Sequence, residues 1–276
     1  MAGLTVVVGG LLSATLARYA PGFGVDERQL DGRLSSASIA ALKNSTAEER
    51  SVLSYYLRYL GRTLSGDFGI SRSMDRPVRE LLRERVAVSC SLAGKAMLLT
   101  WLAAAGLVFV TGWLRRPALS LGSTVVSGAL LCIPAGALAL LSVLFNAPAY
   151  LALACILFPK VHRYLSNVTS ATVGMPHIVM AKAKGLSQTR ILLWHIVPVI
   201  RREVLALAGV SVALAISAAI PVEALCGIPG IGQLAWQSAL ARDLPLLINL
   251  SMLIIAGVTL ANSGLELLAE GRRPLP

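Results

Sequence analysis

Three histidines and four cysteines are the side chains of this sequence best suited to metal binding or nucleophilic chemistry. His162, His177 and His195 are spaced 15 and 18 residues apart, and no carboxylate cluster accompanies them, so zinc-ligand spacing does not arise. The cysteines stand singly in or beside apolar stretches. They therefore predict neither a metal site nor a disulfide framework, and we expect small buried residues at Cys90, Cys132, Cys155 and Cys226.

Two charged residues interrupt long apolar stretches, and ionisable groups at membrane depth are costly and often functional. Lys95, inside residues 86–114, could meet a carboxylate of a ligand if it faced a pathway. The alternative, which we favour, is that its amine reaches the surface or faces a partner helix. Glu223 closes residues 204–225 beside Pro221, where a gate contact competes with a water-exposed interfacial carboxylate; we favour the latter.

A glycine-rich turn follows Glu223 and has a re-entrant pattern. Backbone in such a turn is tolerated at membrane depth only where protein or a water cavity satisfies it. We interpret the turn as functional, and a purely structural turn is the alternative. Its residues are Gly227, Pro229, Gly230 and Gly232.

Catalysis is not predicted for this chain. The sequence has no glycine-rich phosphate loop ending in Gly-Lys-Ser/Thr and no nucleophile elbow. Its apolar blocks also offer no pair of catalytic or metal-binding residues at membrane depth, which an intramembrane enzyme would need.

A helix, a glycine turn and a second helix are predicted within residues 159–203. Residues 176–184 form the first helix, with Pro176 at an allowed first-turn position, and Gly185 ends it with positive φ. Ser187 caps a second helix over residues 188–197, and Pro198 is expected to break it before the next apolar block.

The two faces of this segment have different expected roles. Ile191, Leu192 and Ile196 share one apolar face of the second helix. Ala181 and Ala183 are small and allow a partner to approach the first helix closely.

The elements that carry these residues are membrane helices. Apolar residues make up 55% of the chain, charged residues 14%, and the mean hydropathy is +0.71. Soluble domains have about 25% charged residues. The net charge of +11 does not indicate nucleic-acid binding, because many basic residues fall in short segments between or after apolar blocks.

Six apolar blocks predict an all-α membrane protein with about six transmembrane helices. Blocks one and four are short, and block one could also be a signal peptide, although no basic residue precedes it. The blocks cover residues 3–17, 86–114, 119–145, 147–158, 204–225 and 246–268.

Basic residues set the predicted orientation. Arg115 and Arg116 are separated from the basic segment 159–203 by the uncharged loop 146–148, and in the loop after block five Arg242 is balanced by Asp243. The basic segments therefore lie on one side, so both termini and segment 159–203 are assigned to the cytoplasm. The chain thus divides into a first, possibly truncated transmembrane helix (1–17), an external segment (18–85) and a five-helix core (86–276).

Four ordered stretches resemble the inner-membrane permeases of binding-protein-dependent ABC importers, in the dipeptide, oligopeptide and nickel branch. The first is Ala181-Lys182-Ala183-Lys184-Gly185-Leu186-Ser187, with Pro198 thirteen positions after the glycine. The others are Tyr56 to Leu60 with Gly66-Asp67-Phe68-Gly69-Ile70-Ser71, Arg76-Pro77-Val78, and Val222-Glu223 through Gly227-Ile228-Pro229-Gly230-Ile231-Gly232 to Pro245.

The resemblance implies a MetI-like permease fold of the B-type subunit and a coupling loop that docks on an ATPase. It implies a second homologous permease subunit, two cytoplasmic ATPases that bind ATP and Mg²⁺, and an external solute-binding protein, in a bacterial or archaeal cytoplasmic membrane. The broad family favours Glu where this chain has Val179, so no ionic contact to the ATPase is expected there.

The predicted function is the permease subunit of an ATP-driven importer of short peptides or a similar small solute. A secondary carrier or channel without ATPase partners is the alternative, and it would need internal repeats and charged midplane sites. The sequence leaves the transported solute open.

Overall fold

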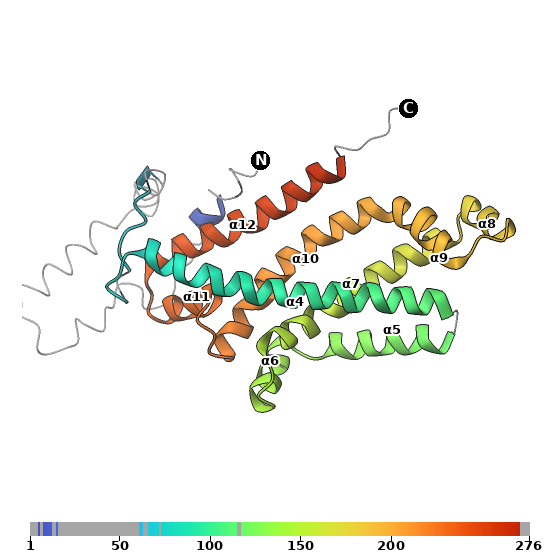
Figure 1. Cartoon of the computed structure of the whole chain (residues 1–276). Coiled ribbons are helices and arrows are strands. Elements are labelled where there is room, and N and C mark those ends of the chain that lie inside the picture. Colours follow the sequence, from blue (N-terminus) through green and yellow to red (C-terminus); the bar gives the residue numbers. More distant parts are fainter. Residues whose placement is uncertain are drawn as a thin grey trace, which may run out of the picture. The chain divides into compact units, whose positions relative to one another are not determined.

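A computed structural model describes residues 5, 8–12, 15, 61–62, 66–71, 73–114 and 117–270 (Figure 1). Within these residues the backbone is almost entirely helical, and extended backbone pairs only in the isolated bridge between Ile70 and Pro77. The predicted all-α fold is therefore confirmed. The helices are α4 (Val78–Leu114), α5 (Pro117–Cys132), α6 (Ala135–Leu144), α7 (Ala149–Val173), α8 (Pro176–Ala183), α9 (Gln188–Ile191), the π-helical turn η2 (Leu192–Ile196), α10 (Val197–Leu225), α11 (Ile231–Leu240) and α12 (Leu244–Glu270).

The chain forms two compact units. One comprises residues 1–85 and 234–257, and the other residues 86–233 and 258–276. Each is described by itself below.

Helix α7 is the centre of the second unit, because α5, α6 and α10 all pack against it (Figure 1). Small residues at these contacts allow close approach of the helix backbones, as membrane helices require. One core cluster joins Leu92, Ala96, Ala139, Leu153, Ala154, Leu157, Ala215, Ala219 and Val222. Thr100 on α4 adds a hydrogen bond from its hydroxyl to the carbonyl of Ala154, at 3.3 Å.

Within the described residues, three helices are long and apolar enough to cross a membrane: Val78–Leu114, Gln188–Leu225 and Pro245–Gly264. A bent pair, Ala118–Cys132 with Ala135–Leu144, brings the number to four if it counts as one span. Of the first apolar block the structure describes only residues 5, 8–12 and 15, all helical, so most of that predicted span lies outside the described residues. The expectation of six spans is not confirmed and stays a prediction.

The third apolar block was expected to cross as one helix, and this is wrong. Its two halves meet at an angle of 93° at Ile133 and Pro134. Proline lacks an N–H and disfavours the helical conformation of the residue before it, which accounts for the bend at this position.

The fourth block is longer than expected. Helix α7 passes through the buried Pro159 and continues to Val173, whereas we expected Pro159 to begin a separate segment. Packing against α5, α6 and α10 outweighs the roughly 3 kcal/mol that an interior proline costs a helix. Residues 159–203 therefore contain the end of α7, then α8, α9, η2 and the start of α10.

His162 consequently lies in a packed helix. It is buried, its Nδ1 is 2.8 Å from the Ser127 hydroxyl of α5, and its ring stacks on Phe158. The hydrogen bond between Ser127 and His162 connects α5 to α7. Of the residues that the structure describes, no three His, Cys, Asp or Glu side chains gather as metal ligands would.

In the first unit, a loop before α4 is attached to the start of α12. Asp243 is buried, and its Oδ2 accepts hydrogen bonds from the Ser71 hydroxyl (2.6 Å) and from the backbone N–H (2.9 Å) and hydroxyl (2.8 Å) of Ser73. Its Oδ1 caps α12 by accepting from the N–H of Leu246. Asn249 donates to the carbonyl of Phe68 at 2.8 Å.

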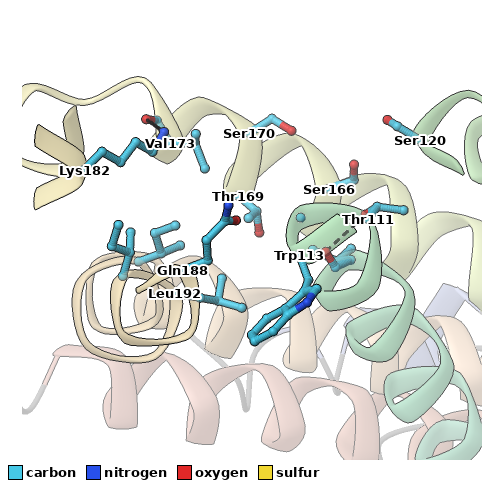
Figure 2. Close-up of a pocket in the computed structure, with 14 residues that line it drawn as sticks. Thr111, Trp113, Ser120, Ser166, Thr169, Ser170, Val173, Lys182, Gln188 and Leu192 are labelled. Carbon is cyan, nitrogen blue, oxygen red and sulfur yellow. Dashed lines mark hydrogen bonds between the residues drawn. The ribbon is translucent and has the colours of Figure 1, made fainter. Parts of the chain in front are cut away.

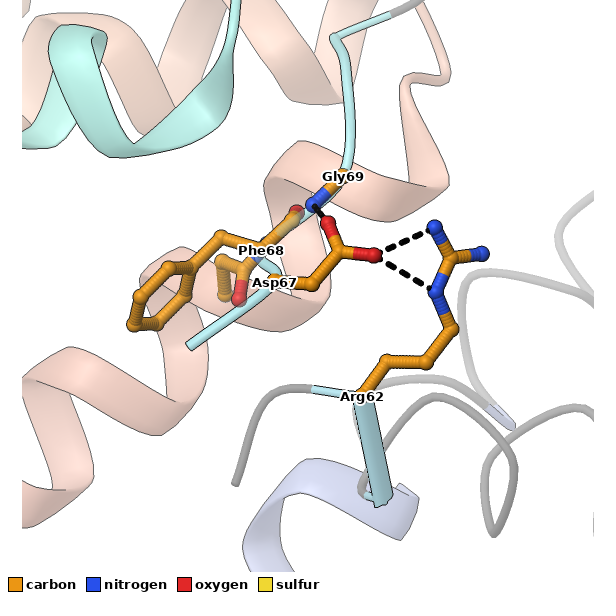
Figure 3. A network of polar contacts seen from close by, with 5 residues as sticks. Arg62, Asp67, Phe68 and Gly69 are labelled. Atoms are coloured by element: carbon orange, nitrogen blue, oxygen red, sulfur yellow. Dashed lines mark hydrogen bonds and ion pairs between the residues drawn. The ribbon is translucent and has the colours of Figure 1, made fainter. Parts of the chain in front are cut away.

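The same loop turns at residues 66–69, where Gly66 and Gly69 have φ of +86° and +73°. Asp67 accepts hydrogen bonds from the Arg62 guanidinium at 2.6 and 2.8 Å and from the N–H of Gly69 at 3.0 Å (Figure 3). The Arg62 hydrogen bond holds the pKa of the Asp67 carboxyl below its usual value.

Candidate functional site

The predicted helix–glycine–helix is present as α8, Gly185 and α9. Pro176 occupies the first turn of α8, and Gly185 has φ of +72°, both as expected. The N–H of Leu186 bonds to the carbonyl of Ala181, and that of Gly185 bonds to the carbonyl of Lys182. These two bonds form a Schellman motif, whose residue after the cap requires a left-handed backbone.

The second helix starts at the expected residue but continues further than expected. Ser187 is the N-cap with extended backbone, although its side chain makes no capping hydrogen bond. The expected break at Pro198 is wrong, because residues Gln188–Leu225 run as one helix. The π turn η2, in which the N–H of Val197 bonds to the carbonyl of Leu192, shifts the hydrogen-bond register just before Pro198. This register shift lets the helix continue through Pro198, which has no N–H to donate to the preceding turn.

One face of the segment packs into its own unit. Ile178, Ala181, Ile191, Ile196 and Ile200 form a buried cluster, with Leu186 and Leu192 packed against it. The shared face of Ile191, Leu192 and Ile196 is confirmed. Ala181 was expected to face a partner, and this is wrong because only 4% of it is exposed.

The opposite face of the segment is exposed. Ala183, Lys184 and Gly185 are exposed at the turn. Large apolar side chains on the same segment are also open: Met175, Val179, Met180, Leu193 and Trp194, the last with 75% of its surface exposed.

The predicted re-entrant turn connects α10 to α11. Gly227 has φ of +66°, and the N–H of Ile228 bonds to the carbonyl of Glu223 at 3.0 Å. Gly230 and Gly232 flank the first residue of α11, Ile231.

Glu223 holds this turn. We favoured a water-exposed carboxylate, and this is wrong: the side chain is fully buried. Its Oε2 accepts from the N–H of Gly232 at 2.6 Å, and the carboxylate also receives hydrogen bonds from the N–H of Gln233 and the hydroxyl of Ser89. A carboxylate is stabilised at a helix N-terminus by such N–H groups and by the helix dipole.

Ser89 completes this arrangement, and sequence reasoning missed it. Its oxygen accepts from the N–H of Ile231 at 2.7 Å while its hydroxyl bonds Glu223. It lies on α4, 142 residues from Ile231, and no local pattern marks it.

Two positions of the turn have no room for a side chain, because the Glu223 carboxylate and the Ile220 backbone occupy the space. A Cβ at Gly230 would overlap the Glu223 carboxylate, and one at Gly232 would lie 2.5 Å from the Cα of Ile220. The turn, Glu223 and Ser89 thus form one closely packed cluster.

Lys95 does not join this arrangement. It is exposed on α4, and no hydrogen bond or ion pair connects it to the residues that the structure describes. An outward position toward lipid or a partner, which we favoured, agrees with this exposure.

A cavity of about 370 Å³ lies beside the α8–α9 segment (Figure 2), and no sequence pattern predicts it. The end of α4, the start of α5, the last turns of α7, and residues of α8, α9 and η2 form its walls.

Known proteins resemble this chain over most of its length. Residues 96–273 match the family described as "Binding-protein-dependent transport system inner membrane component". The oligopeptide transport system permease protein OppB of Escherichia coli (strain K12) is 27% identical over 224 residues, covering 74% of this chain and 73% of that protein. OppB of Salmonella typhimurium is 28% identical over 226 residues, with the same coverage. A Brucella ovis protein provisionally named a peptide permease is 24% identical over 294 residues, covering 94% of this chain and 92% of that protein.

The family match includes the whole α8–α9 segment, the long helix Gln188–Leu225 and the turn held by Glu223. It extends over more than half of the chain, and the structure supplies the apolar helices that an integral membrane subunit needs. This chain therefore belongs to the binding-protein-dependent transport system inner membrane components and is a permease subunit of an ABC importer.

Proposed function

We propose that this permease forms half of a translocation pathway for short peptides or a similar small solute, beside a second, homologous permease subunit. The names of the relatives support this solute class, since they are an oligopeptide permease in Escherichia coli and Salmonella typhimurium and a provisional peptide permease in Brucella ovis. The small residues at its helix contacts suit close packing of membrane helices.

Energy comes from two cytoplasmic ATPase subunits, which bind ATP and Mg²⁺, and solute comes from an external binding protein. This chain itself binds no cofactor in the proposal, since its sequence contains no phosphate-binding loop.

The proposed orientation places both termini and the α8–α9 segment in the cytoplasm of a bacterial or archaeal cell. Lys182, Lys184 and Arg190 in this segment, and Arg201 and Arg202 after it, are the positive charges that favour the cytoplasmic side.

The coupling proposal rests on the α8–Gly185–α9 segment, which includes residues 181–187 and has one buried face and one exposed face. One side is anchored in the permease by Ile178 and Ile191, and the other exposes Val179 and Met180. An apolar patch at a polar surface is typical of a protein–protein contact. We infer that this face docks on the ATPase, and that the contact at Val179 is apolar where the broader family uses a carboxylate.

One helix connects this contact to the turn held by Glu223. Residues Gln188–Leu225 form a continuous helix, about 57 Å long at 1.5 Å per residue. That is nearly twice the roughly 30 Å of a bilayer core. We infer that a displacement at α9 is transmitted along this continuous helix to residues 226–232.

Replacing Ala183 with Glu tests the docking face. Ala183 is exposed, so the change leaves the permease folded and inserted, but it places a carboxylate in the contact with the ATPase. We expect uptake and transport-coupled ATP hydrolysis to fall at least tenfold in liposomes containing the full complex, with weaker ATPase co-purification. Ala241→Glu, also at an exposed alanine, is the matched control and should transport normally. Binding of the external protein should persist in both variants.

Gly185 offers a second variant. Because a Cβ at Gly185 meets nothing within 4 Å in this chain, Gly185→Val strains the permease itself only through its positive φ, at about 1–2 kcal/mol. We expect Val to abolish coupling and Asn, which tolerates this conformation, to preserve most of it. Normal coupled transport in both Ala183→Glu and Gly185→Val would refute the assignment of this segment.

A further inference from the structure

The cavity beside the α8–α9 segment has an unusual set of donors. Three of them, Ser166, Thr169 and Ser170, follow one face of α7 at helical spacing, and Ser120 of α5 and Gln188 of α9 add two more (Figure 2). Their side chains make no hydrogen bonds to other described residues. None of the described lining residues is acidic.

Among the described residues that line the cavity, Lys182 is the only cation. Lys182 is half-buried, and its Nζ donates one long hydrogen bond, 3.4 Å, to the carbonyl of Val173. The ammonium group has three donors, so two remain. Hydroxyl, amide and ammonium donors without a competing carboxylate are the chemistry that binds a phosphate group.

The remaining walls are apolar. Ile191 and Ile196 are buried, and Val108 and Leu192 lie beside them. A ligand that fills the cavity therefore has an anionic part and a hydrocarbon part.

The position of the cavity along the helices gives its depth in the membrane. It lies at the C-terminal end of α4, a membrane-spanning helix, and is lined there by Trp113, half of which is exposed. Tryptophan is enriched where the hydrocarbon core meets the headgroups. In the proposed orientation this is the cytoplasmic leaflet.

We propose that this cavity binds the phosphate headgroup of an anionic phospholipid from the cytoplasmic leaflet, with the acyl chains beside the apolar wall. Basic pockets between membrane helices on that side bind such headgroups. The bound lipid bridges α7 to α8 and α9, so it fixes the segment that carries the docking face. Lipid binding stands independently of the proposed coupling role, and only its effect on transport rests on that role.

The test measures binding separately from transport. The assembled transporter is placed in phosphatidylcholine nanodiscs with increasing phosphatidylglycerol, and native mass spectrometry counts the phosphatidylglycerol molecules that stay bound after delipidation. Lys182→Gln removes the cation, and Thr169→Leu replaces a donor with a larger apolar side chain that narrows the cavity. Lys160→Gln and Asn167→Leu, at exposed positions of α7 outside the cavity, are the matched controls.

The wild type should retain phosphatidylglycerol in preference to phosphatidylcholine. Lys182→Gln should weaken that retention about fivefold, and Thr169→Leu should weaken it at least as much. Both controls should bind as the wild type does.

Three outcomes would overturn the proposal. They are equal retention in all variants, no preference for the anionic lipid, and displacement of bound lipid by millimolar inorganic phosphate, which would identify a soluble anion as the ligand. Loss of lipid binding in Thr169→Leu with normal transport would leave the site standing and refute only its effect on coupling.

Discussion

At the scale of single residues, the buried carboxylate of Glu223 explains why side chains do not fit at Gly230 and Gly232 in the turn that follows it. A buried carboxylate is costly unless it is hydrogen-bonded, and this one receives bonds from two backbone N–H groups and the Ser89 hydroxyl. The N–H groups belong to the first turn of α11, so the charge also meets the positive end of a helix. Gly230 and Gly232 leave the space that the carboxylate and the Ile220 backbone occupy.

Substitution of Gly232 tests this packing. Gly232→Ala should destabilise the permease by about 1–3 kcal/mol, because its Cβ would lie 2.5 Å from a backbone atom that cannot move aside as a side chain would. The measurement is the thermal stability of the detergent-solubilised subunit by size-exclusion chromatography. Gly136→Ala is the control, since its Cβ would meet the Leu225 side chain at an ordinary 3.6 Å. Equal melting of the two variants would show that the turn is not closely packed.

Glu223→Gln tests the charge at nearly constant volume. The glutamine carbonyl can replace Oε2 and its amide nitrogen can replace Oε1, which has no hydrogen-bond partner among the described residues, so the change mainly removes the negative charge at the N-terminus of α11. We expect stability to fall by about 1–3 kcal/mol and uptake to fall with it. Ser89→Ala, which removes one donor, should have a smaller effect. Wild-type stability and uptake of Glu223→Gln would show that the negative charge has no role.

At the scale of elements, prolines act differently according to what surrounds them. Pro134 lies between α5 and α6 at a bend of 93°, whereas Pro159 lies inside α7 and leaves it continuous. The difference is that α7 packs against helices on several sides. Pro198 follows a π turn, and it too leaves the helix from Gln188 to Leu225 continuous.

Another element-scale contact attaches the loop around Ser71 to α12 through Asp243. Asp243→Ala removes three hydrogen bonds to Ser71 and Ser73 and the cap of α12, so we expect a loss of about 2–3 kcal/mol in this unit. Limited trypsin digestion should then cleave faster at the Arg72–Ser73 bond, because Ser73 loses both of its hydrogen bonds to Asp243. Asp75→Asn, at an exposed acid of the same loop, should digest as the wild type does, and equal digestion of both variants would contradict the attachment.

At the scale of the whole molecule, the permease exposes far more apolar surface than a soluble protein. Only 11% of the most apolar 18-residue stretch of α4 is buried within the chain. Leu98, Leu102 and Leu121 are all more than 60% exposed. Such surface is stable against lipid or against a partner subunit. The exposed faces therefore fit both the membrane and the second permease of the proposed complex.

Cysteine labelling tests the proposed orientation. With the four native cysteines replaced by alanine, a cysteine at Lys184 or at Arg115 should react with a membrane-impermeant maleimide only from the cytoplasmic side. A cysteine at Ser45 should react only from outside. Both expectations follow from the distribution of Lys and Arg, and labelling of the Lys184 position from outside would invert the topology.

The sequence alone determined the features that depend on composition and on neighbouring residues. Blocks of apolar residues fix the helical membrane class, because unpaired backbone polar groups are too costly in lipid. Local chemistry fixed the start of α8 at Pro176, the left-handed Gly185 and the start of α9 after Ser187. Four ordered motifs indicated the family to which the chain belongs.

Only the tertiary structure decided which side chains are buried and where helices continue through proline. Glu223, Ser89 and the turn residues form one unit because α4 and α10 bring together positions more than a hundred residues apart, and no local pattern encodes that contact. Ala181 faces inward and Ala183 outward for the same reason, since burial depends on what packs against α8. The cavity lined by Lys182 and Thr169 likewise exists only where separate helices leave space between them.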